Sequence, residues 1–138
     1  MERMKTQCNY INLRRATNAL TKYYDNKIKS CGITSNQLSI LKNIDRIGIC
    51  NVTKLSNHMG LERTTLIRNL RPLFKKGFVE DISFTEKRSC QLKITSVGCK
   101  VLEDGMLLWK EAQNGIDRKL GKDNVALLTN LLSLIETI

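Results

Sequence analysis

Apolar residues recur every three or four positions through much of the chain, and charged residues fill the places between them. This spacing predicts an amphipathic helix over about 7–29 and a second helix over about 35–47. A short helix over about 53–59 follows, then a tight turn at Gly60 and a longer helix over 62–76. A short helix, a glycine turn and a longer helix together indicate a helix-turn-helix.

The period of the pattern changes after the fourth helix. Residues 78–82 and 91–94 read as two short strands, and the polar segment 83–90 between them reads as an extended hairpin loop, which is the pattern of a wing. Two more helices are predicted over about 96–115 and 123–138, with an interrupted stretch between them. The 138 residues are therefore expected to form one domain, mainly α-helical with a small β-wing.

The last predicted helix is apolar on most of its circumference. Leucine, isoleucine, valine and alanine occupy nine of the positions in 123–138. A helix of this composition cannot face water along its length. We therefore expect it to pack in a core or against a second chain.

The net charge of +10 favours an anionic partner such as nucleic acid, an acidic lipid or an acidic protein. A merely solubilising surface is the alternative. Residues 1–100 carry 19 Lys and Arg against 7 Asp and Glu, whereas residues 101–138 carry 4 against 6. The positive potential therefore belongs to the first three quarters of the chain.

Several classes of protein are disfavoured by what the sequence lacks. It has no apolar run of 18 residues, and its polar N-terminus lacks a signal-peptide core, so we expect a cytoplasmic protein without a membrane partner. Five cysteines without a C-x-x-C pair argue against a disulfide framework and a zinc ribbon, and free thiols are expected. With His58 as its one histidine, the chain is predicted to bind no metal and no other cofactor.

The predicted helix over 62–76 has the chemistry of a DNA reader. It holds five cations and one anion, and its apolar positions share one face. Arg, Asn and Thr side chains read base edges in the major groove, and the N-terminal half of such a helix usually enters it. An ordinary solvated face is the alternative. The candidate base readers are Arg63, Thr64, Thr65, Arg68 and Asn69, and the residues expected to meet phosphates or lie on the surface are Arg71, Lys75 and Lys76.

The tip of the predicted wing is basic. It carries Lys87 and Arg88, and Glu86 would orient Arg88 through a salt bridge. A cation on a hairpin tip can enter a narrow minor groove or clamp a phosphate. The alternative is an exposed turn with ordinary charges.

Over about 34–102 the chain resembles the MarR family of bacterial and archaeal regulators. The reading helix of that family carries R-[ST]-T-[VL]-x-R, here residues 63–68, followed by K-G-[LF]-V, here 76–79. A wing with D-x-R and a strand ending in L-T-x-x-G come next; here they read E-K-R at 86–88 and I-T-S-V-G at 94–98. Each motif alone is a weak indicator of the family, but the combination of motifs is specific.

Two residues depart from the family pattern. Glu86 stands where the family usually has Asp, so the geometry of the wing is expected to differ slightly. Pro72 is not general to the family. It removes one helix hydrogen bond and clashes with the carbonyl of Arg68, which predicts a local bend or an early change of helix geometry.

The resemblance implies a homodimer with two winged-helix lobes, each spanning about 35–95. The helices at about 7–29, 96–115 and 123–138 would build the dimerisation region. A two-fold dimer implies a pseudo-palindromic operator on double-stranded DNA, with half-sites about one turn apart. The implied function is that of a transcriptional repressor, released by a small ligand or by thiol oxidation.

Two candidate sensing sites follow from the resemblance and the residues. A ligand pocket between the dimerisation region and the lobe would use Tyr10, Arg14, Tyr23 and Tyr24, although a core role explains most of them more simply. Cys8 begins the first helix, where the helix dipole and unpaired N–H groups favour the thiolate. It would then form a sulfenic acid or a disulfide across the dimer. The alternative is a small buried hydrophobe.

Two other classes of function stay open at this point. A nonspecific architectural or RNA-binding protein would use the same basic surface, but the chain has no aromatic stacking platform of the kind that single-strand binders use. An enzyme such as a thiol peroxidase would need an acid–base pair, a triad or a phosphate loop. The sequence offers none of these, and no catalytic residue is predicted.

Overall fold

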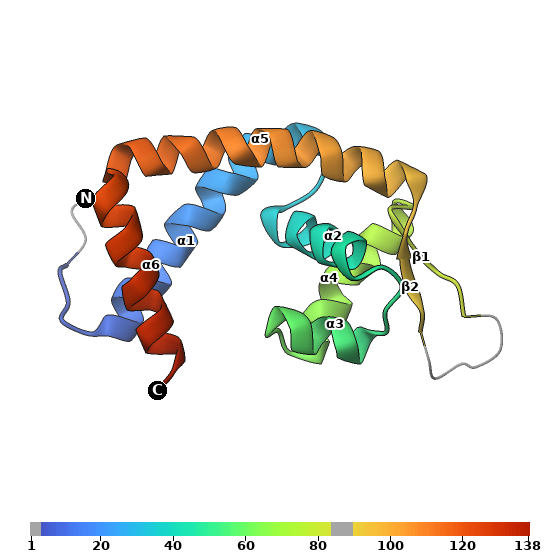
Figure 1. Ribbon diagram of the computed structural model, residues 1–138, viewed down its shortest axis with the longest axis horizontal. Coiled ribbons are helices and arrows are strands. Elements are labelled where there is room, and N and C mark those ends of the chain that lie inside the picture. Colours follow the sequence, from blue (N-terminus) through green and yellow to red (C-terminus); the bar gives the residue numbers. More distant parts are fainter. Residues whose placement is uncertain (1–3, 84–89) are drawn as a thin grey trace.

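Helices form most of the computed structural model, which describes residues 4–83 and 90–138 (Figure 1). The two strands form a small antiparallel sheet. The prediction of a mainly α-helical chain with a small β-wing is confirmed. In chain order the elements are α1 (Asn9–Ile28), the 3-10 turn η1 (Lys29–Cys31), α2 (Ser35–Ile47), α3 (Val52–Met59), α4 (Arg63–Lys75), β1 (Val79–Asp81), β2 (Leu92–Ile94), α5 (Ser96–Leu120) and α6 (Lys122–Glu136).

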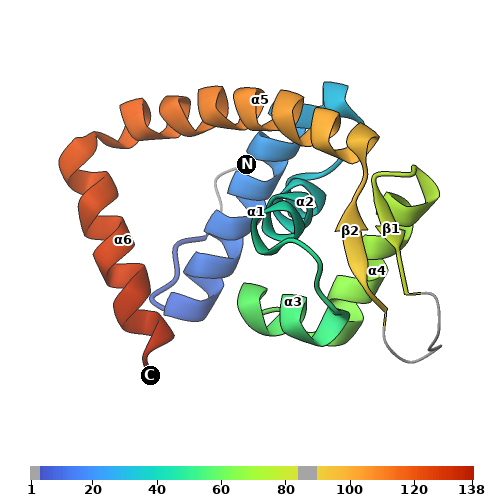
Figure 2. The same cartoon turned by 45° about the vertical axis from the view of Figure 1, so that its right-hand side comes forward.

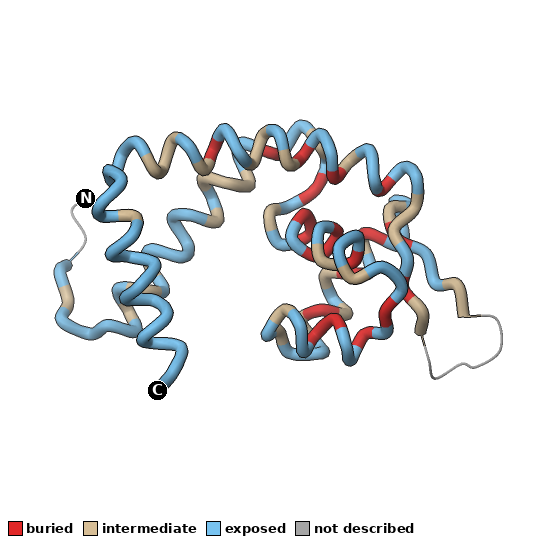
Figure 3. The backbone as a smooth tube through the Cα atoms, in the orientation of Figure 1, coloured by how far each residue is buried: buried red, intermediate tan, exposed pale blue. Residues whose placement is uncertain are grey.

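The elements from α2 to β2, here called the lobe, pack together beneath the first half of α5 (Figure 1). The buried residues are concentrated in this part of the molecule (Figure 3). They come from every helix of the lobe, from β2 and from the end of α1, so the core is built within one chain. The fully buried large side chains are Ile28, Ile40, Leu41, Ile44, Leu55, Leu66, Leu73 and Leu92.

Local signals set the helix ends in the lobe. Thr34 and Gln37 form a capping box, in which each side chain accepts a hydrogen bond from the other residue's backbone N–H, at 3.2 and 3.0 Å. Asn51 caps α3 by accepting a hydrogen bond from the Lys54 N–H at 2.7 Å. Gly60 ends α3 with a φ of 64°, a left-handed conformation that glycine adopts at little cost. The predicted glycine turn of the helix-turn-helix is therefore confirmed.

The long helix α5 overturns one predicted boundary. The prediction that the helix starting at about 96 ends at about 115 is wrong, because α5 continues to Leu120. Gly115 does not break the helix; it makes room for α1, since a Cβ there would lie 2.5 Å from the Tyr23 hydroxyl. Gly105 does the same for α2, where a Cβ would lie 2.7 Å from Leu38 Cδ1. Gly105 and Gly115 thus mark close contacts of α5 with other helices.

The helix α4 tolerates its internal proline. Pro72 has no N–H to donate, yet the helix continues to Lys75, and the Lys76 N–H donates to the Pro72 carbonyl at 3.0 Å. Leu70 and Leu73 on either side are buried, so tertiary packing supports the helix where one backbone hydrogen bond is lost. The proline therefore does not end α4.

Outside the lobe, α1 and α6 flank the far half of α5 (Figure 2). Tyr23 of α1 donates a hydrogen bond to the Ala112 carbonyl of α5 at 3.2 Å. The ring of Tyr24 stacks on Trp109, with ring centroids 6.2 Å apart. In contrast, no residue of α6 is buried within the described chain. No helix in residues 4–83 and 90–138 is long and apolar enough to cross a membrane.

Candidate nucleic-acid interface

The helix α4 buries one face and exposes the opposite one. Leu66, Leu70 and Leu73 form the buried face. The helix Arg63–Lys75 contains four cations and no acidic residue. The exposed side is therefore a strip of positive charge and hydrogen-bond donors on the outside of the lobe. Its exposed members from the predicted set are Arg63, Thr64, Arg68, Arg71 and Lys75.

The neighbouring helix α3 positions one of these residues. The Arg63 guanidinium donates a hydrogen bond to the Thr53 hydroxyl at 3.0 Å. Lys54, the next residue of α3, is a further exposed cation. Neither Thr53 nor Lys54 was among the candidate residues named from the sequence. Thr53 and Lys54 could have been identified by their position in the first turn of the helix that precedes the reading helix.

Three predicted contact residues are already engaged within the chain. Thr65 and Asn69 are half-buried, and the Asn69 amide donates to the Thr65 carbonyl at 3.0 Å. To contact an adenine through both the oxygen and the nitrogen of its side-chain amide, Asn69 would have to give up this hydrogen bond. The Lys76 ammonium donates to the Gly32 carbonyl between α1 and α2. Lys76 therefore helps to hold the lobe together.

The wing begins as a short ladder. Its strands pair antiparallel, with Val79 opposite Ile94 and Asp81 opposite Leu92. The ladder gains one further rung, because the Ile82 N–H donates to the Gln91 carbonyl at 2.9 Å. The basic tip, with Glu86, Lys87 and Arg88, lies outside the described residues.

The carboxylate of Asp81 gathers hydrogen bonds at the base of the wing. Its Oδ1 accepts from the Ser83 N–H at 2.9 Å, from the Ser83 hydroxyl at 2.7 Å and from the Gln91 N–H at 3.1 Å. These hydrogen bonds, led by the two from Ser83 and joined by one from the Cys90 thiol, lower the pKa of Asp81 to about 2. Asp81 is therefore ionised throughout the neutral pH range.

The four residues of the predicted ligand pocket lie in two places within one chain. Tyr23 and Tyr24 pack against α5, with their ring centroids 5.7 Å apart. Tyr10 and Arg14 are exposed nearer the start of α1. Tyr10 and Tyr23 are separated by about 20 Å along the helix axis, at 1.5 Å per residue. Tyr23 and Lys27 of α1 line a concavity of 330 Å³ together with residues of α5. The ligand role of all four stays a prediction.

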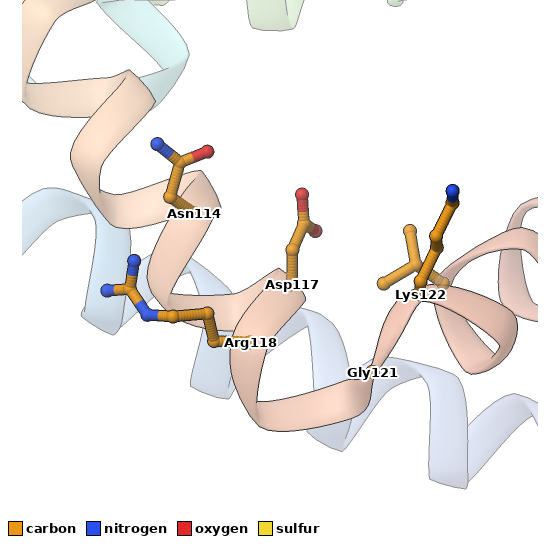
Figure 4. Close-up of a pocket in the computed structure, with 6 residues that line it drawn as sticks. Asn114, Asp117, Arg118, Gly121 and Lys122 are labelled. Carbon is orange, nitrogen blue, oxygen red and sulfur yellow. The ribbon is translucent and has the colours of Figure 1, made fainter.

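A second concavity, of 470 Å³, lies at the corner between α5 and α6 (Figure 4). Gly121 forms the corner with a φ of 88°. Asn114, Asp117, Arg118 and Lys122 line the walls, so the surface carries charges of both signs. It lies at the end of α5 remote from the lobe, on helices predicted to meet a second chain (Figure 1).

The cysteines fall into two groups. Cys8 is exposed at the N-cap of α1, as its predicted redox role requires, and Cys99 is exposed at the start of α5. Burial raises the pKa of the thiols of Cys31, Cys50 and Cys90, to about 11 for Cys90. Raised pKa values keep these three thiols protonated and unreactive near neutral pH. In the part of the chain that the structure describes, no group of three or more His, Cys, Asp or Glu is placed to hold a metal ion.

A helix-turn-helix, an antiparallel wing and a cationic second helix define a winged helix-turn-helix protein. Residues 33–82 match the MarR family model. Among curated proteins, no sequence matches the chain.

Three solved structures are similar over nearly the whole chain. The regulator MosR of M. tuberculosis, in complex with DNA, is 28% identical, with a TM-score of 0.80 over 95% of this chain and 98% of that one. A mutant of E. coli MarR with operator DNA is 22% identical, with a TM-score of 0.82 over 95% and 99%. BpsR of Bordetella bronchiseptica is 14% identical, with a TM-score of 0.87 over 100% of both chains. The chain thus contains a segment that matches the MarR family model and is similar over nearly its whole length to transcriptional regulators, MosR among them.

Proposed function

We propose that the protein is a sequence-specific transcriptional repressor that binds a pseudo-palindromic operator on double-stranded DNA as a homodimer. In this proposal α4 enters the major groove and the wing contacts the flanking backbone or minor groove. The proposed base readers are Arg63, Thr64, Thr65, Arg68 and Asn69, and the proposed backbone or minor-groove contacts are Arg71, Lys75, Lys87 and Arg88.

The exposed cationic face of α4 carries the proposal. The major groove is wide enough for one α-helix, and arginine is its commonest specific reader. Arg68 and Arg71 have no ion-pair partner within residues 4–83 and 90–138, where the one ion pair joins Lys100 to Asp104. These guanidinium groups are thus available to an anionic polymer. The similar MosR and MarR chains, which were solved with DNA, support this reading.

The homodimer is supported by the surface that one chain leaves exposed. A compact folded protein of this mass, 15.8 kDa, would expose roughly 7,300 Å². This chain exposes 10453 Å². The excess of roughly 3,100 Å² per chain is larger than what one partner of a permanent interface usually buries, which is about half of a total on the order of 2,000–5,000 Å². The apolar side chains of α6, such as Leu131 and Leu134, contribute to it.

Release of the DNA is proposed to follow binding of a small ligand or oxidation of Cys8. DNA binding by BpsR is regulated by 6-hydroxynicotinic acid, and E. coli MarR has an oxidised form. The exposure of Cys8 at the start of α1 is compatible with the oxidative route. DNA affinity before and after mild peroxide, with Cys8→Ser as control, separates the two routes. Equal loss of affinity in the wild type and the Cys8→Ser variant would exclude Cys8 as the sensor.

Selection of binding sites from randomised duplexes tests the main proposal. We expect a site with two inverted half-sites about one turn apart. Its affinity should exceed that of random duplex at the same salt concentration by a factor on the order of 10³ or more. Equal affinity for both duplexes would reject a specific reader and favour the alternative, a nonspecific architectural protein.

A further inference from the structure

We infer that Asp81 is a positioning residue for the wing, which fixes the two ends of the wing loop relative to each other before DNA is bound. This inference rests on the proposed function, in which the wing contacts DNA. It adds a role for a residue that does not itself touch DNA.

The donors that meet at Asp81 come from both ends of the loop. Ser83 leads into the loop and donates through its N–H and its hydroxyl, whereas Gln91 follows the loop and donates through its N–H. All three reach the same oxygen, Oδ1, over 2.7–3.1 Å. One carboxylate oxygen therefore links two segments that are eight residues apart in sequence.

This link stands where the backbone ladder ends. The last rung within the described residues joins the Ile82 N–H to the Gln91 carbonyl at 2.9 Å. The Asp81 side chain supplies the next connection, since it spans from Ser83 to the Gln91 N–H. A loop whose ends are fixed has fewer conformations to lose when it is ordered at an interface. Asp81 should therefore increase the affinity of a wing contact that it does not make.

The charge of Asp81 is unfavourable for DNA binding, which makes the hydrogen bonds the better explanation of its presence. Asp81 is exposed on a lobe whose reading helix is cationic. A carboxylate near DNA phosphates lowers affinity by repulsion. The two effects of Asp81, repulsion and positioning, therefore have opposite signs and can be measured separately.

Two variants of the full-length dimer separate these effects. Asp81→Asn removes the charge but keeps an oxygen that can accept one hydrogen bond from each end of the loop, whereas Asp81→Ala removes both the charge and the acceptor. We expect Asp81→Ala to bind the selected operator about tenfold more weakly, the order expected when one or two further side chains must be ordered on binding. Asp81→Asn should bind within about twofold of the wild type, or more tightly. Tighter binding by both variants to the same degree would show that only the charge matters and would overturn the inference.

A double-mutant cycle with Arg88→Ala shows whether the effect passes through the wing. If Asp81 positions the wing, the loss caused by Asp81→Ala should shrink to about twofold or less in the Arg88→Ala background. An undiminished loss would overturn the role of Asp81 while leaving the wing contact intact. If Arg88→Ala alone leaves affinity and its salt dependence unchanged, the wing contact itself fails, and the role of Asp81 fails with it. Melting temperatures of all variants should agree within a few degrees, because the side chain is exposed.

Discussion

The lobe and α6 differ in how far their apolar side chains are buried within one chain. In the lobe, side chains such as Leu41 and Leu66 are fully buried by neighbours from the same chain. In α6, whose composition is more apolar, Leu131 is 47% exposed and Leu134 is 65% exposed. The lobe therefore has a complete core within one chain, whereas the apolar side chains of α6 stay exposed and would be covered by the second chain of the proposed homodimer.

The exposed surfaces of the two regions also differ in chemistry. The lobe presents Arg68, Arg71 and Lys75 from a helix without acidic residues, which suits a polyanion. The part of the chain that contains α6, residues 101–138, carries more acidic than basic residues. The proposed function accordingly assigns the surface of the lobe to DNA and the surface of α6 to the second chain. Each variant below alters one region and leaves the other as a control.

The largest effect is expected from a charge in the apolar face of α6. Leu131→Asp would bury an unpaired carboxylate in the proposed dimer interface, so the dimer should dissociate. Operator affinity should fall by about a hundredfold or more, because each lobe would then bind alone. Sedimentation and DNA titration measure the two effects. Ser133→Asp, on the opposite side of the same helix, is the matched control and should remain dimeric. A dimeric Leu131→Asp protein would contradict the comparison.

A cavity in the lobe should reduce stability without changing the interface. Leu66→Ala removes a fully buried side chain from the inner face of α4 and should cost about 2–5 kcal/mol of unfolding free energy. Chemical denaturation at a fixed protein concentration measures this cost. The variant should still be dimeric below its unfolding midpoint. A loss below about 1 kcal/mol would mean that the core of the lobe depends on something other than this packing.

The base-reading role of α4 predicts a smaller and more specific loss. Arg68→Ala should cost about 1–3 kcal/mol of operator binding and reduce the preference for the operator over random duplex. Arg46→Ala, which removes an exposed cation at the end of α2, serves as the control for net charge. Equal losses in the two variants would assign Arg68 a purely electrostatic role. Titrations at several salt concentrations distinguish the cases.

The smallest effect concerns the relative reactivity of the thiols. At pH 8 an alkylating reagent should modify the exposed Cys8 and Cys99 first. Cys50 and Cys90 of the lobe should react slowly, because burial raises their pKa values and the thiolate is the reactive form. Raising the pH towards 11 should accelerate the reaction of Cys90. Mass spectrometry of the labelled peptides gives the order, and rapid labelling of Cys90 at pH 8 would show that the base of the wing opens.

The elements of the fold were largely predictable from the sequence. The helix spacing, the glycine turn at Gly60 and the cationic face of α4 are all local patterns, and the structure contains them. Gly115 was misread because a glycine in a helical pattern indicates a break as readily as a close contact. Which of the two it is depends on Tyr23, which lies 92 residues away in the chain.

The candidate interface was predictable only in part. Arg63, Arg68 and Arg71 were identified by their helix and are exposed, but Lys76 was not recognised as a partner of the Gly32 carbonyl. Thr53 was overlooked because its contact with Arg63 crosses from one helix to the next. Side-chain types and their period reveal which face of a helix is polar. They do not reveal which polar groups are already paired.

The sequence by itself determined the elements, their order, the resemblance to the MarR family and the apolar composition of α6, because each follows from residues close together in the chain. The tertiary structure decided how those elements meet. It showed that glycines in α5 admit α1 and α2, that Tyr10 and Tyr23 lie about 20 Å apart along one helix, and that Asp81 joins both ends of the wing loop. The physical reason is that periodicity records the environment of a residue within its own helix or strand. Contacts between elements depend instead on the path of the whole chain.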